Sequence, residues 1–136
     1  MDMVDLSQWF RNWHGNPGAT SDVVEIEQSR LGIALPGEYL DFVRQSNGGM
    51  GFVGDAYVDF WRIDELRQFN SECESHIYAP GILLFGTNGG NDGYGFDFRE
   101  PVVRFVRIPL IGMALDMIEH LGDTFGAFLS NISSDQ

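Results

Sequence analysis

The chain has 136 residues, a net charge of −12, twenty acidic residues, and eight basic residues that are all arginine. Without lysine it has no Schiff-base nucleophile, no phosphate-loop lysine and no lysine general base. The acidic excess argues against nucleic acid as a direct ligand, because phosphate binding requires clustered cations. It favours attraction to a basic partner, although the same charge also serves solubility alone.

A single domain is expected from this length, because typical domains contain about 100–150 residues. Cys73 is the only cysteine, which excludes an internal disulfide. We interpret it as a partly buried or surface thiol and not as a nucleophile. The N-terminus lacks a secretory signal pattern, and the longest apolar run, residues 108–115, is too short to span a bilayer. We therefore expect a cytoplasmic protein without a membrane partner.

The first part of the chain is predicted to be helical. Residues 4–13 carry apolar side chains at helical spacing, and the Gly-Asn-Pro-Gly segment after them ends the element. Ser21 or Asp22 can cap a second helix, which ends at Gly32.

A third helix is expected to begin at Pro36 and to end at Asn47, Gly48 and Gly49, since glycine tolerates left-handed backbone conformations. The glycines of residues 49–54 also match the dinucleotide fingerprint letter for letter. That motif needs a strand before it and a helix after it, whereas here a helix precedes and a strand follows. We interpret the segment as a glycine-rich helix stop and expect no cofactor.

The hydrophobic period then changes to that of strands. Strands are predicted at residues 56–63, 82–85, 94–98 and 102–108, with a hairpin turn over 87–93. A short helix at 64–69 capped by Asp64, a surface loop at 70–80, and a final helix capped by Asp123 or Thr124 complete the prediction, while residues 113–121 could be helix or loop. This order predicts an α+β domain with an antiparallel sheet flanked by N-terminal helices and a C-terminal helix.

No motif in the chain requires catalysis. Residues 88–99 resemble a calcium loop, but Gly90 and Arg99 occupy ligand places, and the flanking elements are strands, so a hairpin turn is the better interpretation. The three histidines are far apart in the sequence: His14, His76 and His120. We expect no catalytic residue and no metal site, and therefore no enzyme. An uncharacterised enzyme is the hypothesis that we rank last, behind the two binding roles given below. It would require a deep pocket with convergent polar groups.

Three segments together resemble a known family. They are residues 31–36 with Tyr39, Phe42 and the Asn-Gly-Gly turn; residues 82–98 with Gly86, Asp92, Tyr94, Gly95 and Asp97; and residues 123–129. This pattern is similar to the SUKH superfamily, which joins the yeast cell-wall-synthesis regulator domain to many bacterial immunity proteins. The resemblance covers residues 20–132 as a core and leaves 1–18 as an extra N-terminal helix and turn.

The resemblance implies a protein-binding immunity protein that neutralises a cognate bacterial toxin by stoichiometric binding. The expected partner is a basic toxin domain such as a nuclease, and the alternative is an intracellular regulatory scaffold like the yeast relative. Loops on a rigid scaffold usually carry recognition. We therefore expect partner contacts in the Asn-Gly-Gly turn, the Trp61 strand and the hairpin, at Asn47, Gly48, Gly49, Trp61, Asn88, Asp92, Tyr94 and Asp97.

Overall fold

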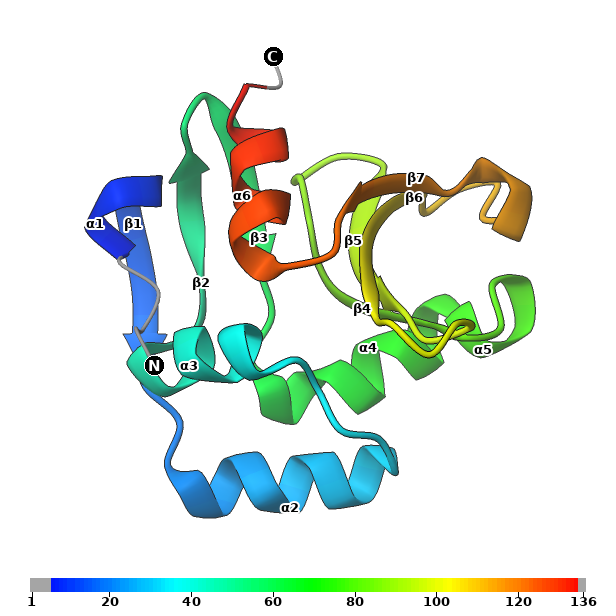
Figure 1. The fold of residues 1–136 in the computed structure, drawn as a ribbon, viewed down its shortest axis with the longest axis horizontal. Coiled ribbons are helices and arrows are strands. Elements are labelled where there is room, and N and C mark those ends of the chain that lie inside the picture. Colours follow the sequence, from blue (N-terminus) through cyan, green and yellow to red (C-terminus); the bar gives the residue numbers. More distant parts are fainter. Residues whose placement is uncertain (1–5, 135–136) are drawn as a thin grey trace.

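One antiparallel sheet of seven strands organises the computed structural model, which describes residues 6–134 (Figure 1). The strands lie side by side in chain order, and every neighbouring pair is antiparallel. They are β1 (Phe10–Pro17), β2 (Ser46–Val53), β3 (Ala56–Phe60), β4 (Ile82–Thr87), β5 (Asp92–Asp97), β6 (Arg104–Pro109) and β7 (Glu119–Gly122). With the helices that flank it, this sheet confirms the predicted α+β class.

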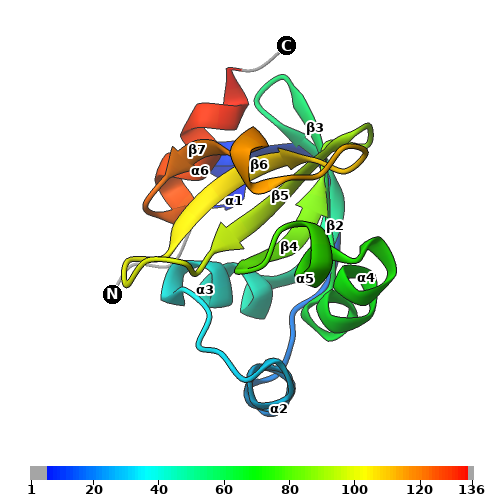
Figure 2. The same ribbon diagram turned by 90° about the vertical axis from the view of Figure 1, so that its right-hand side faces the viewer.

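The helices lie around the sheet at different places. Figure 2 shows α4 and α5 beside β4, with α2 lying apart from the sheet. The helical elements are α1 (Leu6–Trp9), α2 (Ser21–Leu31), α3 (Gly37–Gln45), α4 (Leu66–Cys73), α5 (Ser75–Tyr78) and α6 (Phe125–Ser133), with short 3-10 turns η1 (Ile63–Glu65) and η2 (Leu115–Met117). Within residues 6–134, none of these helices is long and apolar enough to cross a membrane.

Helix ends follow local chemistry that was mostly predictable. The cap of α2 is Thr20, one residue before the predicted position, and its hydroxyl accepts a hydrogen bond from the Val23 N–H at 3.2 Å. Gly32 ends α2 with φ of 72°. Thr124 caps α6 by accepting from the Ala127 N–H at 3.0 Å. Side-chain oxygens at these positions satisfy amides that the helix leaves unpaired.

The predicted first helix is wrong over most of its length. Only α1 is helical, β1 begins at Phe10, and residues 4 and 5 of the predicted helix lie outside the described residues. The apparent helical spacing comes from a register shift between Arg11 and His14, where Asn12 has φ of 50°. This irregularity brings Phe10 and Trp13 onto one side of the strand, with ring centroids 4.4 Å apart. A bulged strand thus imitates the i, i+3 spacing of a helix.

The glycine-rich segment is also a strand and not a helix stop. α3 ends at Gln45, and Asn47, Gly48 and Gly49 already belong to β2. A Cβ atom at Gly49 would lie 2.8 Å from the Trp13 ring, and one at Gly51 3.0 Å from the same ring. Glycine is therefore needed where β1 lays its tryptophan across β2.

The predicted surface loop at 70–80 is wrong as well. Residues 66–73 form α4 and 75–78 form α5, while Asp64 lies inside η1 and does not cap a helix. The polar composition that suggested a loop includes two buried side chains, Asn70 and Ser75. The Asn70 amide accepts from the Leu84 N–H and donates to the Leu84 carbonyl, both at 2.8 Å. One side chain therefore takes the place of a neighbouring strand beside β4.

The remaining predictions agree with the structure more closely. The strands expected at 82–85, 94–98 and 102–108 correspond to β4, β5 and β6 within a few residues. The hairpin turn is present, and its Asn88 N–H donates to the Asp92 carbonyl at 3.0 Å. The undecided stretch 113–121 contains η2 and the start of β7.

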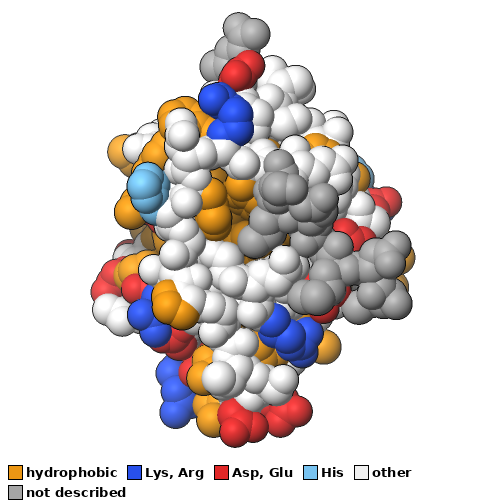
Figure 3. All heavy atoms as spheres, turned by 90° about the vertical axis from the view of Figure 1, so that its left-hand side faces the viewer, with side chains coloured by type: hydrophobic (Ala, Val, Ile, Leu, Met, Phe, Trp, Pro, Cys, Tyr) orange, Lys and Arg blue, Asp and Glu red, His pale blue; other side chains and the backbone are white. Residues whose placement is uncertain are grey.

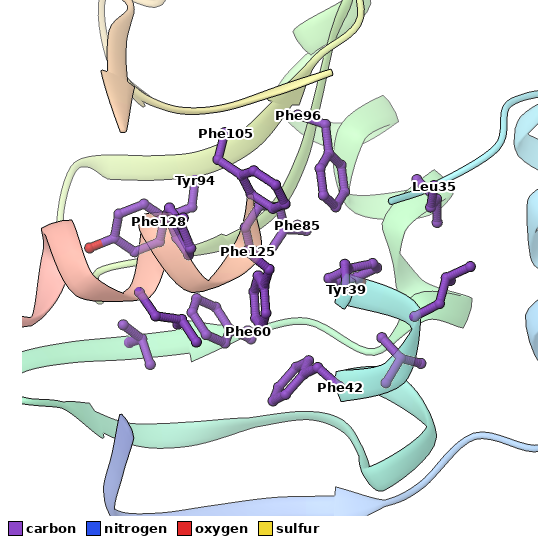
Figure 4. Close-up of a cluster of buried hydrophobic side chains, with 14 of the residues drawn as sticks. Leu35, Tyr39, Phe42, Phe60, Phe85, Tyr94, Phe96, Phe105, Phe125 and Phe128 are labelled. Atoms are coloured by element: carbon purple, nitrogen blue, oxygen red, sulfur yellow. The ribbon is translucent and has the colours of Figure 1, made fainter. Parts of the chain in front are cut away.

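Two hydrophobic cores lie on opposite faces of β4, β5 and β6. The larger core joins α3 and α6 to the sheet, and Figure 4 shows its aromatic rings directed toward one another from helices and strands. Phe60, Phe85, Phe105 and Phe128 are among its members. The smaller core lies under α4, α5 and the segment before β7, and contains Ala79, Ile82, Leu84, Val106, Ile108 and Met113. Cys73 is half-buried at its margin.

Candidate partner-binding surface

The outward face of β3 is the part of the sheet that combines exposed aromatic, apolar and acidic side chains. Val58 and Phe60 point into the core, so the alternation of a strand turns Tyr57, Asp59 and Trp61 to the other side. On β2, Phe52 pairs with Tyr57 and Met50 with Asp59. Met50 is 48% exposed and Tyr57 39% exposed. We call these five outward-facing positions, Met50, Phe52, Tyr57, Asp59 and Trp61, the β3 face.

One end of the β3 face is stiffened by aromatic contacts. The rings of Phe52 and Tyr57 meet edge to face with centroids 5.7 Å apart, and the Arg11 guanidinium lies 5.5 Å from the centre of the Phe52 ring. Arg11 also donates to the Gly54 carbonyl at 2.8 Å. Rigid, partly exposed aromatics of this kind are typical anchors at protein interfaces, because little side-chain entropy is lost on binding.

The other end of the β3 face borders a hollow of about 360 Å³, which we call the Trp61 hollow. The Trp61 ring meets Phe69 of α4 edge to face at 4.9 Å, which fixes its orientation. The lining comes from β1, β2, β3, the two residues after β3, η1 and α4. It consists of His14, Asn16, Gly49, Met50, Asp59, Phe60, Trp61, Arg62, Glu65 and Phe69.

The Trp61 hollow is electrostatically unfavourable for the Asp59 carboxylate. Burial raises the pKa of Asp59, and the nearby Glu65 raises it further. Arg62 does not relieve this, because its guanidinium binds both carboxylate oxygens of Asp64, at 3.2 and 2.8 Å. That bond holds the pKa of the Arg62 guanidinium above its ordinary value.

A second depression, the acidic cleft, opens where β3 separates from β4. These two strands pair only through Asp59 with Thr87 and Phe60 with Gly86, so the first half of β3 diverges from the rest of the sheet. The cleft has a volume of about 530 Å³. It is lined by Asp55, Ala56, Tyr57, Asn88, Asp92, Tyr94, Arg107, Pro109, Met117 and Glu119.

Negative charge exceeds positive charge in the acidic cleft. It contains three carboxylates and one guanidinium, and Arg107 is bound to Glu119 at 2.9 and 3.1 Å. Tyr57 of β3 lines the cleft, while Asp59 of the same strand and Trp61, the residue after it, line the Trp61 hollow. The cleft and the hollow are therefore joined by the β3 face.

Five of the predicted contact residues lie in these two depressions. Asn88, Asp92 and Tyr94 line the acidic cleft, and Gly49 and Trp61 line the Trp61 hollow. Asn88 is held within its turn, where its side-chain oxygen accepts from the Gly90 N–H at 2.9 Å.

The other three predicted residues have structural roles. The Asn47 side chain is buried, donates to Asp64 at 3.1 Å and accepts from the Ile63 N–H at 2.8 Å, which fixes the start of η1. Gly48 is buried with φ of 73°, and a Cβ atom there would lie 2.5 Å from the Phe60 carbonyl oxygen.

Asp97, at the far end of β5, is buried and forms a two-pronged ion pair with Arg99 at 2.9 and 2.8 Å. The structure therefore brings neither Asn47, Gly48 nor Asp97 to the β3 face. Among the described residues, no group of three or more His, Cys, Asp or Glu side chains is placed to hold a metal ion.

Several residues of the surface were missed by sequence reasoning. Met50, Tyr57, Asp59 and Glu119 were not singled out, although the alternation of Tyr57, Asp59 and Trp61 is visible in the sequence. For Met50 the missing signal was the strand character of β2, because glycine is depleted in strands.

Seen from the β1 edge, the described surface carries hydrophobic side chains, and its arginines are scattered and not gathered into a patch (Figure 3). Comparison with protein families matches residues 18–131 to the SMI1 / KNR4 family (SUKH-1). No curated protein matches the chain.

Proposed function

The chain belongs to the SMI1 / KNR4 family (SUKH-1), and we propose that it is an immunity protein that neutralises a cognate bacterial toxin by stoichiometric binding. The family consists generally of non-enzymatic immunity and regulatory domains. Binding in place of catalysis also agrees with a surface whose depressions are open and carry aromatic and acidic side chains.

The observation that carries the proposal is that the partly exposed aromatics of the β3 face lie between two depressions that each contain more carboxylates than guanidinium groups. Interfaces draw most of their affinity from a few aromatic or arginine anchors surrounded by polar residues. Acidic side chains at the rim accelerate encounter with a basic surface. A toxin that acts on nucleic acid presents such a basic surface, so a basic toxin domain such as a nuclease is the partner we propose, met in the cytoplasm.

The first experiment is affinity capture from the native organism's lysate, followed by purification of the captured partner. We expect a basic toxin that forms an equimolar complex in calorimetry and loses its activity at equimolar protein. Recovery of regulatory or cell-wall-synthesis factors instead would favour the regulatory role found elsewhere in the family and overturn the immunity proposal. A captured toxin that stays active at saturation would also overturn it.

Matched surface variants then test the interface. Met50→Ser and Tyr57→Ser remove exposed side chains from the β3 face, whereas Ile77→Ser removes a side chain that is 55% exposed on α5. We expect the first two to weaken the complex by about tenfold or more, because hot-spot truncations cost upwards of ~1–2 kcal/mol. Ile77→Ser should leave affinity unchanged. Equal effects from all three would contradict the location of the interface.

A further inference from the structure

The Asp59 carboxylate is not paired with a basic side chain of the described residues. Among residues 6–134, its carboxylate has no hydrogen bond and no ion pair, although it lies half-buried in the Trp61 hollow. Partly buried carboxylates normally obtain a donor or a counter-ion, because desolvating a charge without compensation is costly. No described residue therefore supplies a hydrogen-bond donor or a counter-ion to the Asp59 carboxylate, and a bound protein could supply one.

The charged groups around Asp59 do not supply that partner. Glu65 is a second carboxylate, and its Oε1 atom accepts from the Arg62 N–H at 3.2 Å. The Arg62 guanidinium is held by Asp64, as described above. His14, which lies on β1 beyond Met50, is the remaining titratable group in the lining and forms no ion pair with a described residue. Two carboxylates thus face a hollow in which the one arginine is already bound elsewhere.

The walls of the hollow fit a flat cation with an apolar stem. Trp61 supplies an aromatic ring held in place by Phe69, and Met50 supplies an exposed thioether side chain on the other strand. A guanidinium can stack on an aromatic ring while it donates to a carboxylate, and its methylene chain can lie along apolar atoms.

We propose that the Trp61 hollow receives an arginine side chain of the bound protein, with its guanidinium on Asp59 and against Trp61. This inference rests on the proposed function and names the anchor within it. Arginine is favoured over lysine because a planar guanidinium can address Asp59 and Glu65 through separate N–H groups.

The test uses a defined probe and does not require the partner. Nα-acetyl-L-arginine amide is titrated into the ¹⁵N-labelled protein at low salt, and Nα-acetyl-L-citrulline amide serves as the neutral probe of the same shape. We expect the arginine compound to shift the Trp61 indole N–H and the Asp59 amide signals with at least tenfold higher affinity than citrulline. High salt should reduce this preference, because the hollow is open to solvent.

Two charge-matched variants separate a site from general attraction. Asp59→Asn should abolish the preference for arginine over citrulline at the Trp61 indole signal. Glu25→Gln, on the exposed face of α2, removes one negative charge elsewhere and should leave the preference intact. Equal losses in both variants, or shifts spread over many acidic residues without the Trp61 signal, would overturn the inference.

Failure of this inference can be distinguished from failure of the proposed function. If the purified toxin binds Asp59→Asn as tightly as the unmodified protein, the anchor is wrong while the immunity role stands. If the arginine probe binds as expected but no toxin is captured, the hollow is an arginine site that serves a different partner.

Discussion

Replacing Asn70 tests whether one side chain joins α4 to the sheet. Its amide nitrogen donates to the Leu66 and Leu84 carbonyls, and its oxygen accepts from the Leu84 N–H and from the Ser75 hydroxyl at 2.7 Å. In Asn70→Ala, the buried N–H and C=O of Leu84 lose their partner together. Each unsatisfied buried group costs about 1–3 kcal/mol, so we expect a loss of roughly 3–5 kcal/mol in the free energy of unfolding.

Urea denaturation followed by tryptophan fluorescence measures this loss, and the thermal midpoint should fall by roughly 10 °C for a domain of this size. Gln68→Ala on the same helix is the control, since the Gln68 side chain is exposed and its hydrogen bond among the described residues is to Glu72, at 3.0 Å. It should change stability by less than about 0.5 kcal/mol. A loss below about 1 kcal/mol in Asn70→Ala would refute the reasoning, because the Leu84 groups would then not depend on this amide.

Three further changes test separate features. Gly48→Ala should destabilise the protein by about 2–4 kcal/mol in thermal unfolding, because the residue has φ of 73° and its Cβ would meet backbone atoms; a neutral result would contradict the close packing. Hydrogen bonds from Arg99 lower the pKa of Asp97. The stability that the ionised Asp97 carboxylate contributes is therefore present above the ordinary carboxylate pKa and is lost as pH falls through the lowered pKa. Asp97→Asn should therefore be less stable than the unmodified protein at neutral pH, with the difference shrinking in acid; a constant difference would refute the charge argument. Asp59 is the opposite case, because burial and Glu65 raise its pKa, so stability is lost as pH rises through that pKa. Asp59→Asn should thus be at least as stable as the unmodified protein at neutral pH, and denaturation at several pH values would expose a contrary trend.

Much of the second half of the fold could be predicted from the sequence because local signals there agree with tertiary structure. The hairpin between β4 and β5 contains the Asn and Gly residues that its turn requires, and Thr124 caps α6 as expected. The first half was predicted wrongly because its first two strands, β1 and β2, lack the composition typical of strands. β1 has an irregular register, and β2 contains glycines that leave room for the Trp13 ring.

The surface that we propose for partner binding was partly predictable from the sequence. The expectation that recognition lies in loops on a rigid scaffold led to the hairpin residues Asn88 and Asp92 and to the segment with Trp61. All three residues line the depressions of the surface. Met50 and Asp59 could not be found, because their proximity arises from the pairing of β2 with β3. Asn47 was chosen for its turn chemistry, yet that chemistry serves η1.

The brief pairing of β3 with β4 has a mechanical consequence. Within residues 6–134, the β3–β4 ladder that joins the β1–β3 half of the sheet to the β4–β7 half has two residue pairs, extended by the Trp61 N–H, which donates to the Phe85 carbonyl at 2.9 Å. Helix α6 packs against strands of both halves. A protein bound along β3 would contact the Trp61 hollow on the β1–β3 half and, across the acidic cleft, residues of the β4–β7 half. Binding would then act as a brace across a narrow seam, slowing amide exchange at Phe60 and Thr87 well beyond the residues that the partner covers.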